Sequence, residues 1–99
     1  KRGISLNGSG LLFKNNNTTQ LVIDHDGNVG IGTTTPQAKL DVTSTTDGVL
    51  LPRLTHAQMY GISSPPAGLM VYNTTFNKLC VYNGTNWQSL DATTIPFLQ

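Results

Sequence analysis

The sequence predicts a mainly β protein, with short strands in its N-terminal half and a small antiparallel meander with one short helix in its C-terminal half. Three observations indicate this. Short aliphatic runs are separated by Gly and Asn along the chain. Charged residues make up only 11% of the 99 residues, against about 25% in an ordinary soluble domain. Ser and Asn, which favour caps and turns over helix interiors, and β-branched Thr contribute 6, 9 and 14 residues, and Glu is absent.

The N-terminal region, residues 1–47, contains four candidate strands. These are Gly10–Phe13, Gln20–Ile23, Val29–Ile31 and Lys39–Val42. Asn15–Asn17 is a turn signal between the first two. None of the strands is long enough to build a sandwich, and an isolated hairpin is only marginally stable in water. This region is therefore expected to bury its apolar residues against a neighbour.

A tight hairpin is expected around Asp26-Gly27, because Asp-Gly supplies the positive φ angles of a two-residue turn. That turn places Ile23 opposite Gly30, and Leu21 opposite Gly32. One strand would then carry aliphatic side chains and the other bare backbone. A second backbone can approach a glycine closely, and its simplest source is another copy of the chain. The pattern predicts an intertwined oligomer.

The C-terminal region, residues 48–99, begins with a candidate strand at Val49–Leu51, which Pro52 should end or push to a sheet edge. A short helix is expected over Thr55–Tyr60. Thr55 followed by Gln58 three residues later has the pattern of a capping box, in which each side chain bonds the other residue's backbone N–H.

Three further runs predict an antiparallel meander. Leu69–Asn73 and Lys78–Tyr82 flank a Thr-Thr-Phe-Asn turn, and Asn83-Gly84 then turns the chain into Asn86–Leu90.

The C-terminal region has few apolar residues for its size. Domains this small usually need disulfides, a metal or association. The single cysteine, Cys80, cannot form an intrachain disulfide, so association is the expected answer.

Charge and hydropathy exclude several partners. The net charge is +1 with scattered basic residues, so we expect no nucleic-acid partner, which would need clustered Lys and Arg. No apolar run approaches the roughly 20 residues that span a bilayer, and we expect no membrane insertion. Lys1-Arg2 does not lead into a signal peptide, and the abrupt start is expected of a fragment of a longer protein. The short apolar ending Ile95–Gln99 is expected to dock as a tail.

Catalytic and metal chemistry is not indicated. The five Asp residues do not form a convincing pair, and no phosphate-binding loop is present, so we expect no enzyme, no catalytic residue and no cofactor. His25 and His56 have no second ligand at metal-binding spacing. They are interpreted as a turn-flanking residue and the first residue of the helix. An alternative, in which one His per chain meets on an oligomer axis to hold a metal, stays open.

Recognition residues are sought among exposed loops of the C-terminal region. The candidate receptor-binding residues are Asn73, Asn77, Asn83, Asn86 and Tyr60. Aromatic rings beside amides suit carbohydrate, and Tyr and Trp are also common interface anchors. For Tyr82 and Trp87 the alternative is that they pair across the Asn-Gly turn and pack the small core.

Two motifs resemble a known family. Gly27–Pro36 (GNVGIGTTTP) followed by Ala38–Val42 (AKLDV) resembles a module of trimeric bacteriophage tail fibres and related viral fibres. The segments GVLLPRLT, GLMVYNTT and LCVYNGTNW within Gly48–Trp87 resemble the part that often follows it. The resemblance implies an elongated, intertwined homotrimeric stalk or collar over residues 1–47 and a head over residues 48–99. The residues expected to pack the trimer are Leu21, Ile23, Val29, Gly30, Ile31, Gly32, Leu40 and Val42.

The resemblance implies a place on the virion surface and leaves three classes of function open. The first is the distal part of a fibre that attaches to a host cell-surface glycan or protein. The second is a purely structural module that trimerises and registers the fibre strands. The third is a bacterial surface adhesin built from the same modules.

Overall fold

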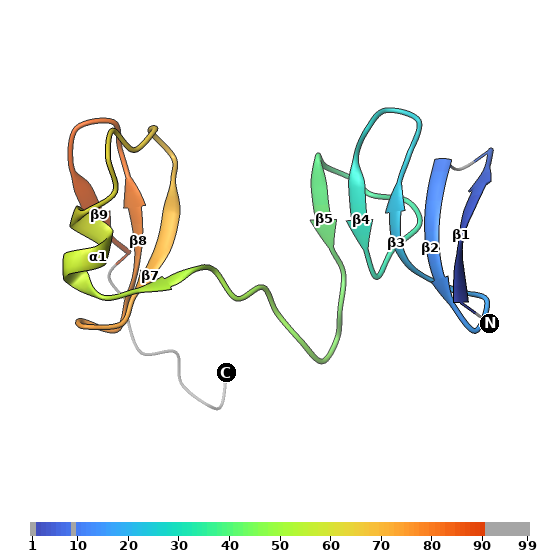
Figure 1. Cartoon of the computed structure of the whole chain (residues 1–99), viewed down its shortest axis with the longest axis horizontal. Coiled ribbons are helices and arrows are strands. Elements are labelled where there is room, and N and C mark those ends of the chain that lie inside the picture. The colour runs from blue at the N-terminus through green and yellow to red at the C-terminus, as the bar shows by residue number, and fades with distance from the viewer. Residues whose placement is uncertain (1, 9, 91–99) are drawn as a thin grey trace, which may run out of the picture. The chain divides into compact units, whose positions relative to one another are not determined.

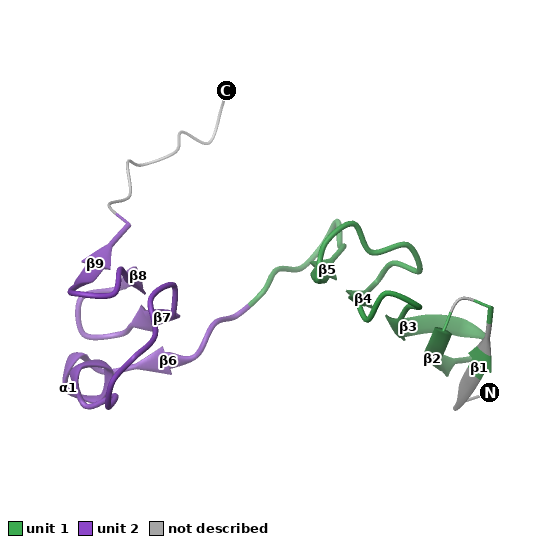
Figure 2. Ribbon diagram, turned by 90° about the horizontal axis from the view of Figure 1, so that it is seen from above, with its two compact units in different colours: residues 1–49 green, residues 50–99 purple. Residues whose placement is uncertain are grey.

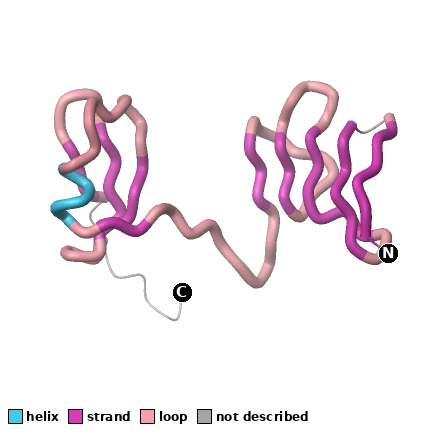
Figure 3. The backbone as a smooth tube through the Cα atoms, viewed as in Figure 1, coloured by secondary structure: helices cyan, strands magenta, loops and turns pink. Residues whose placement is uncertain are grey.

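The computed structural model describes residues 2–8 and 10–90 (Figure 1). Contacts within the chain divide it into two compact units, residues 1–49 and residues 50–99 (Figure 2). The division falls two residues from the predicted boundary after Asp47. Strands and loops make up both units apart from one short helix in the described part of the second (Figure 3). The expected mainly β fold is confirmed, while the tail Ile95–Gln99 lies outside the described residues.

The first unit is a five-stranded sheet whose strands follow one another in chain order. The strands are β1 (Arg2–Asn7), β2 (Gly10–Asn15), β3 (Thr18–Ile23), β4 (Val29–Ile31) and β5 (Leu40–Val42). The first four pair antiparallel, and β5 pairs parallel to β4. The four expected strands are present, and the first two extend further than the sequence indicated. β1 was not predicted, because its first half carries no clear alternation of polar and apolar residues.

The expected turn between β2 and β3 is confirmed. Asn16 and Asn17 both have positive φ angles, of 52° and 65°, and they link the closing pair Asn15 and Thr18. Two successive residues of positive φ form the two-residue turn that matches the twist of a hairpin, and Asn tolerates this conformation well.

The β3–β4 hairpin has a longer loop than predicted. The Asp24 and Asn28 backbones close it, with the Asp24 N–H donating to the Asn28 carbonyl at 3.0 Å. The Asp24 carboxylate accepts the N–H groups of Asp26 and Asn28, each at 2.9 Å. Gly27 takes the positive φ of 80° that ends such a three-residue loop.

The extra loop residue shifts the register of that hairpin by one. Val22 lies opposite Gly30, and Leu21 lies opposite Ile31. The predicted pairing of Ile23 with Gly30 and Leu21 with Gly32 is therefore wrong. Its physical cause is the Asp24 side chain, which stabilises a wider loop than the Asp-Gly dipeptide alone would require.

The second unit is a four-stranded sheet with the helix packed on it. In sheet order its strands are β6 (Arg53–Leu54), β7 (Met70–Asn73), β8 (Lys78–Tyr82) and β9 (Trp87–Ser89). β7, β8 and β9 form the expected antiparallel meander. β6 adds parallel to β7, which the sequence did not indicate.

The expected strand at Val49–Leu51 is wrong. The ladder with β7 begins at the Pro52 carbonyl, which accepts the Tyr72 N–H at 2.8 Å, and continues at the Leu54 carbonyl, which accepts the Thr74 N–H at 2.8 Å. Pro52 has no N–H of its own to donate, so the pairing does not extend back through it to the aliphatic run.

The helix α1 (His56–Tyr60) forms as predicted, with a complete capping box. The Gln58 N–H donates to the Thr55 hydroxyl at 3.2 Å, and the Thr55 N–H donates to the Gln58 side-chain oxygen at 2.9 Å. The helix places Met59 in the core of this unit with Val71 and Cys80. Leu54, Ile62 and Trp87 pack around these three.

Tyr82 and Trp87 pair across the last turn, as the alternative interpretation predicted. They are directly opposite in the ladder, and their rings meet edge to face with centroids 5.3 Å apart. Cys80 is buried as a small apolar core residue.

Candidate interaction surfaces

One face of the first sheet is apolar on four adjacent strands. Residues directly opposite one another in a ladder share a face, so the register defines two rows across the sheet. The rows are Phe13, Leu21, Ile31, Val42 and Leu11, Ile23, Val29, Leu40. These eight residues are called the apolar face below.

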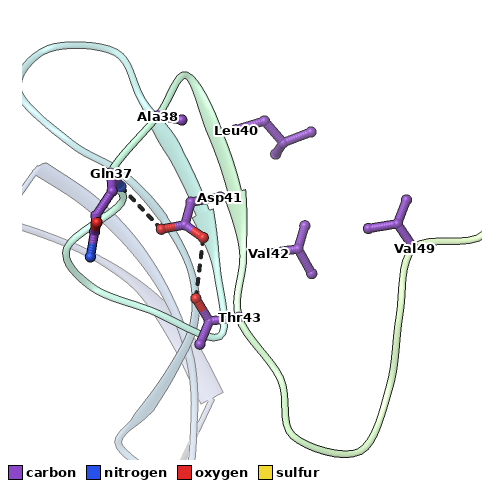
Figure 4. Close-up of a pocket in the computed structure, with 7 residues that line it drawn as sticks. All are labelled: Gln37, Ala38, Leu40, Asp41, Val42, Thr43 and Val49. Atoms are coloured by element: carbon purple, nitrogen blue, oxygen red, sulfur yellow. Dashed lines mark hydrogen bonds between the residues drawn. The ribbon is translucent and has the colours of Figure 1, made fainter.

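Part of the apolar face is open to solvent, although an antiparallel sheet usually presents polar residues to water. Ile31 is 42% exposed and Leu40 is 59% exposed, and Ile23 and Val42 are also exposed. Figure 4 shows Leu40 and Val42 on the side of β5 opposite to Asp41, beside Val49. Together with neighbouring polar residues these three line an open hollow of about 550 Å³. Contiguous exposed apolar patches mark sites of association.

The opposite face of the sheet is covered by its own chain. Leu12 and Val22 are buried there, in the row that continues through Gly30 to Asp41. The Asp41 carboxylate accepts the Gln37 N–H at 3.0 Å and the Thr43 hydroxyl at 3.2 Å (Figure 4). The connection between β4 and β5 is thus held against this face.

Six of the eight residues predicted to pack a trimer lie on the apolar face, and the two glycines do not. Gly30 is on the covered face, where a Cβ atom would come 2.7 Å from the Thr33 carbonyl oxygen. A Cβ on Gly32 would come 2.2 Å from the Thr43 carbonyl oxygen. The backbone that approaches each glycine belongs to the same chain, so the reason first given for these glycines, a neighbouring chain, is replaced by close packing within one chain. A role for them in the trimer stays a prediction.

Asn73 is not available to a receptor, because its side chain is 1% exposed. Its oxygen accepts the N–H groups of Thr75 and Phe76, each at 3.0 Å. Its amide nitrogen donates to His56 Nδ1 at 3.0 Å. The prediction of a receptor-binding Asn73 is therefore corrected: the residue ties the β7–β8 turn to α1.

The other candidate receptor residues lie at opposite ends of the meander. Asn77 is in the exposed β7–β8 turn with a φ of 55°. Asn83 and Asn86 are in the β8–β9 turn, where the Asn83 side-chain oxygen accepts the Asn86 N–H at 2.7 Å. Tyr60 and Asn86 come together around a hollow of about 210 Å³. Their role in binding stays a prediction.

A second hollow in the same unit was not anticipated. It has a volume of about 280 Å³, and the residues at its wall and rim include His56, Tyr60, Phe76, Lys78, Trp87 and Gln88. The His56 ring lies 4.7 Å from the Tyr60 ring and 4.9 Å from the Phe76 ring, between centroids. We call this hollow the aromatic pocket. His56 and Tyr60 are four apart on a helix and so share a face, which was a usable sequence signal, but nothing local placed Phe76 beside them.

A comparison with models of protein families identifies the family of this chain. The model of a family described as a phage tail-like trimerisation region matches residues 30–96. The chain belongs to this family. Searches of the curated proteins and of the solved structures gave no significant match.

The match to the trimerisation region covers both units in part. It begins at Gly30 in β4 and includes β5, α1 and the whole meander. The resemblance to phage tail-fibre modules drawn from the two motifs is thereby confirmed. β1, β2 and β3 lie before the matched residues, and β2 and β3 carry four of the eight residues of the apolar face.

The two histidines of the chain, His25 before the matched residues and His56 within them, each have a partner within the chain. His25 Nε2 donates to the Gly8 carbonyl, and His56 Nδ1 accepts from Asn73. Residues 2–8 and 10–90 contain no group of three His, Cys, Asp or Glu side chains that could hold a metal ion. Across the same residues, no helix is long and apolar enough to cross a membrane.

Proposed function

We propose that three copies of this chain associate through the apolar face to form the distal part of a phage-like fibre on the virion surface, with the second unit as a head that attaches to the host cell. The observation that carries the proposal is the apolar face itself. Burying it between copies removes from water the large side chains that the single chain leaves exposed. Membership in a trimerisation family supports three copies, which a closed ring of identical chains would satisfy.

Attachment is favoured over a purely structural role by one observation in the head. Tyr60 is 60% exposed and Phe76 is 58% exposed, and both lie at the aromatic pocket. Exposed aromatic side chains around a hollow are typical of a recognition site. A bacterial surface adhesin, the third class of function, would have the same architecture and would differ from a phage fibre only in the organism that makes it.

Assembly is tested by sedimentation equilibrium at low micromolar concentration. We expect a species of three times the 10.6 kDa chain mass. Ile31→Lys should dissociate it, because it places three charges in an apolar interface, at a cost of several kcal/mol for each unpaired ion. The apparent dissociation constant should rise on the order of 100-fold or more. Gln20→Lys adds the same charge at an exposed position of β3 outside the apolar face, and should leave the mass unchanged. A folded wild-type monomer would refute the proposed assembly.

Attachment is tested separately by the binding of fluorescently labelled trimer to candidate host cells and envelope extracts. We expect weak binding per site, strengthened by three linked copies. Asn77→Gly, which keeps the positive φ of 55° at that position, and Asn86→Ser should reduce cell binding without changing the melting temperature if these loop tips contact the receptor. A trimer that binds no cell surface, but whose deletion stops a longer fibre from assembling, would establish the structural role instead.

A further inference from the structure

The aromatic pocket is walled by two segments that are distant in sequence and held together by hydrogen bonds. The Asn73 side-chain amide donates a hydrogen bond to His56 Nδ1. The backbone N–H of His56 donates a second one to the Thr75 hydroxyl at 2.9 Å. The same Asn73 side chain holds the Thr75 and Phe76 N–H groups. The α1 helix and the β7–β8 turn are therefore fixed relative to each other before any ligand arrives, which lowers the ordering cost of binding.

The chemistry of the pocket combines an apolar floor with polar groups at its edge. Met59 and Cys80 are buried beneath it. The rings of Tyr60, Phe76 and Trp87 contribute flat apolar surface, while Gln88 contributes an amide. Because Asn73 donates to His56 Nδ1, the hydrogen of the neutral imidazole resides on Nε2, which makes that nitrogen a donor.

From these observations we infer that the aromatic pocket binds a single sugar ring of a cell-surface glycan. A sugar presents an apolar C–H face that stacks on aromatic rings, and hydroxyls around its edge that hydrogen-bond to amide and imidazole groups. The volume of about 280 Å³ is just below the usual range of about 300–1,000 Å³ for pockets of drug-sized ligands. It fits one ring better than a segment of polypeptide. This inference rests on the attachment function proposed above and names the ligand class and the site.

A second copy of the chain is the competing occupant. It would have to insert a protruding side chain into the pocket and would bury Phe76 in the trimer. A pocket that accepts a side chain from another protein chain is usually lined mainly by apolar residues. This pocket also has Lys78, Gln88 and Ser89 along its lining. The two occupants are distinguished by measuring whether variants of Phe76 still form the trimer.

Trp87 makes the inference directly measurable, because it is the only tryptophan in the chain and lines the pocket. The intact trimer is titrated with methyl pyranosides of the common hexoses and N-acetylhexosamines, and tryptophan emission is recorded. At least one sugar should change the emission saturably, with a dissociation constant on the order of millimolar, typical of weak single-site binding. An emission unaffected by every sugar in the panel would overturn the inference.

Phe76→Ala should weaken the binding of that sugar at least tenfold while leaving the trimer mass and melting temperature unchanged, and Phe76→Tyr should restore it. Met70→Ala is the matched control, since Met70 is 40% exposed and does not line the pocket. Retained affinity in Phe76→Ala overturns the sugar site, and so does dissociation of its trimer, which would show a second copy in the pocket. If Phe76→Ala trimers still bind host cells as wild type does, attachment stands and only the sugar pocket is wrong.

Discussion

Gly32→Val should unfold the β4–β5 part of the first sheet. Gly32 has a φ of 78°, and a residue other than glycine in such a conformation costs roughly 1–3 kcal/mol. A Cβ atom would also lie 2.2 Å from the Thr43 carbonyl oxygen, so the backbone after β5 would have to move. That movement breaks the 2.9 Å bond between the Thr43 N–H and the Ile31 carbonyl. Amide hydrogen exchange of Thr43, and of Ile31 in the paired strand, should lose most of its protection.

Thr34→Val is the control for that change, because it places the same valine side chain two residues away at an exposed position where a branched residue already stands. Surface changes of this kind usually alter stability by no more than about 0.5 kcal/mol. The comparison also separates the two explanations of the glycines. If Gly32→Val kept full protection in β4 and β5 while the trimer dissociated, the close neighbour of Gly32 would belong to another chain, as the sequence pattern first indicated.

Local signals predicted the head well. Thr55 and Gln58 are three residues apart and satisfy each other's backbone groups without help from the rest of the chain. The turns Thr74–Asn77 and Asn83–Asn86 lie between strands that pair with the expected partners. In each case the residues that determine the structure are within a few positions of one another, so the sequence contains the whole interaction.

Long-range pairing was predicted less well. β6 exists only because Tyr72 in β7 and Thr74 just after it donate their N–H groups to the Pro52 and Leu54 carbonyls. No property of residues 49–54 reveals that distant edge. The register of the β3–β4 hairpin depended on whether Asp24 would join the loop. A shift of one residue moves every side chain of a strand to the other face, so this single uncertainty displaced Gly30 from the face on which it was expected.

The candidate interface also combines features that local sequence predicted with features that depend on long-range pairing. Leu21, Ile23, Val29, Ile31, Leu40 and Val42 were predicted to pack a trimer, and the register places all of them on one face. Alternation grouped the residues within each strand, but only the observed register places Val29 and Ile31 on the same face as Leu21 and Ile23. Phe13 and Leu11 join them only through the β2–β3 pairing. The aromatic pocket, in contrast, needs α1 and the β7–β8 turn to meet, and that contact depends on the burial of one side chain, Asn73.

Asn73→Ala should destabilise the head by about 2–3 kcal/mol. The substitution removes the oxygen that accepts the Thr75 and Phe76 N–H groups and the amide that donates to His56 Nδ1. Each buried polar group left without a partner costs roughly 1–3 kcal/mol, and the exposed turn lets water replace part of the loss. Denaturant unfolding followed by the emission of Trp87 reports on this unit alone, since the first unit contains no tryptophan.

Asn86→Ala is the control for Asn73→Ala, because Asn86 is an exposed amide of the same unit and its loss should change the free energy of unfolding by no more than about 0.5 kcal/mol. Asn73→Ala should also weaken sugar binding at the aromatic pocket, since His56 and Phe76 would no longer be held against each other. An Asn73→Ala head as stable as wild type, combined with lost attachment to cells, would return Asn73 to the role of receptor contact that its place before a turn first indicated. If the free energy of unfolding of the head and the sugar affinity of the aromatic pocket both fall, Asn73 is established as the residue that positions the pocket.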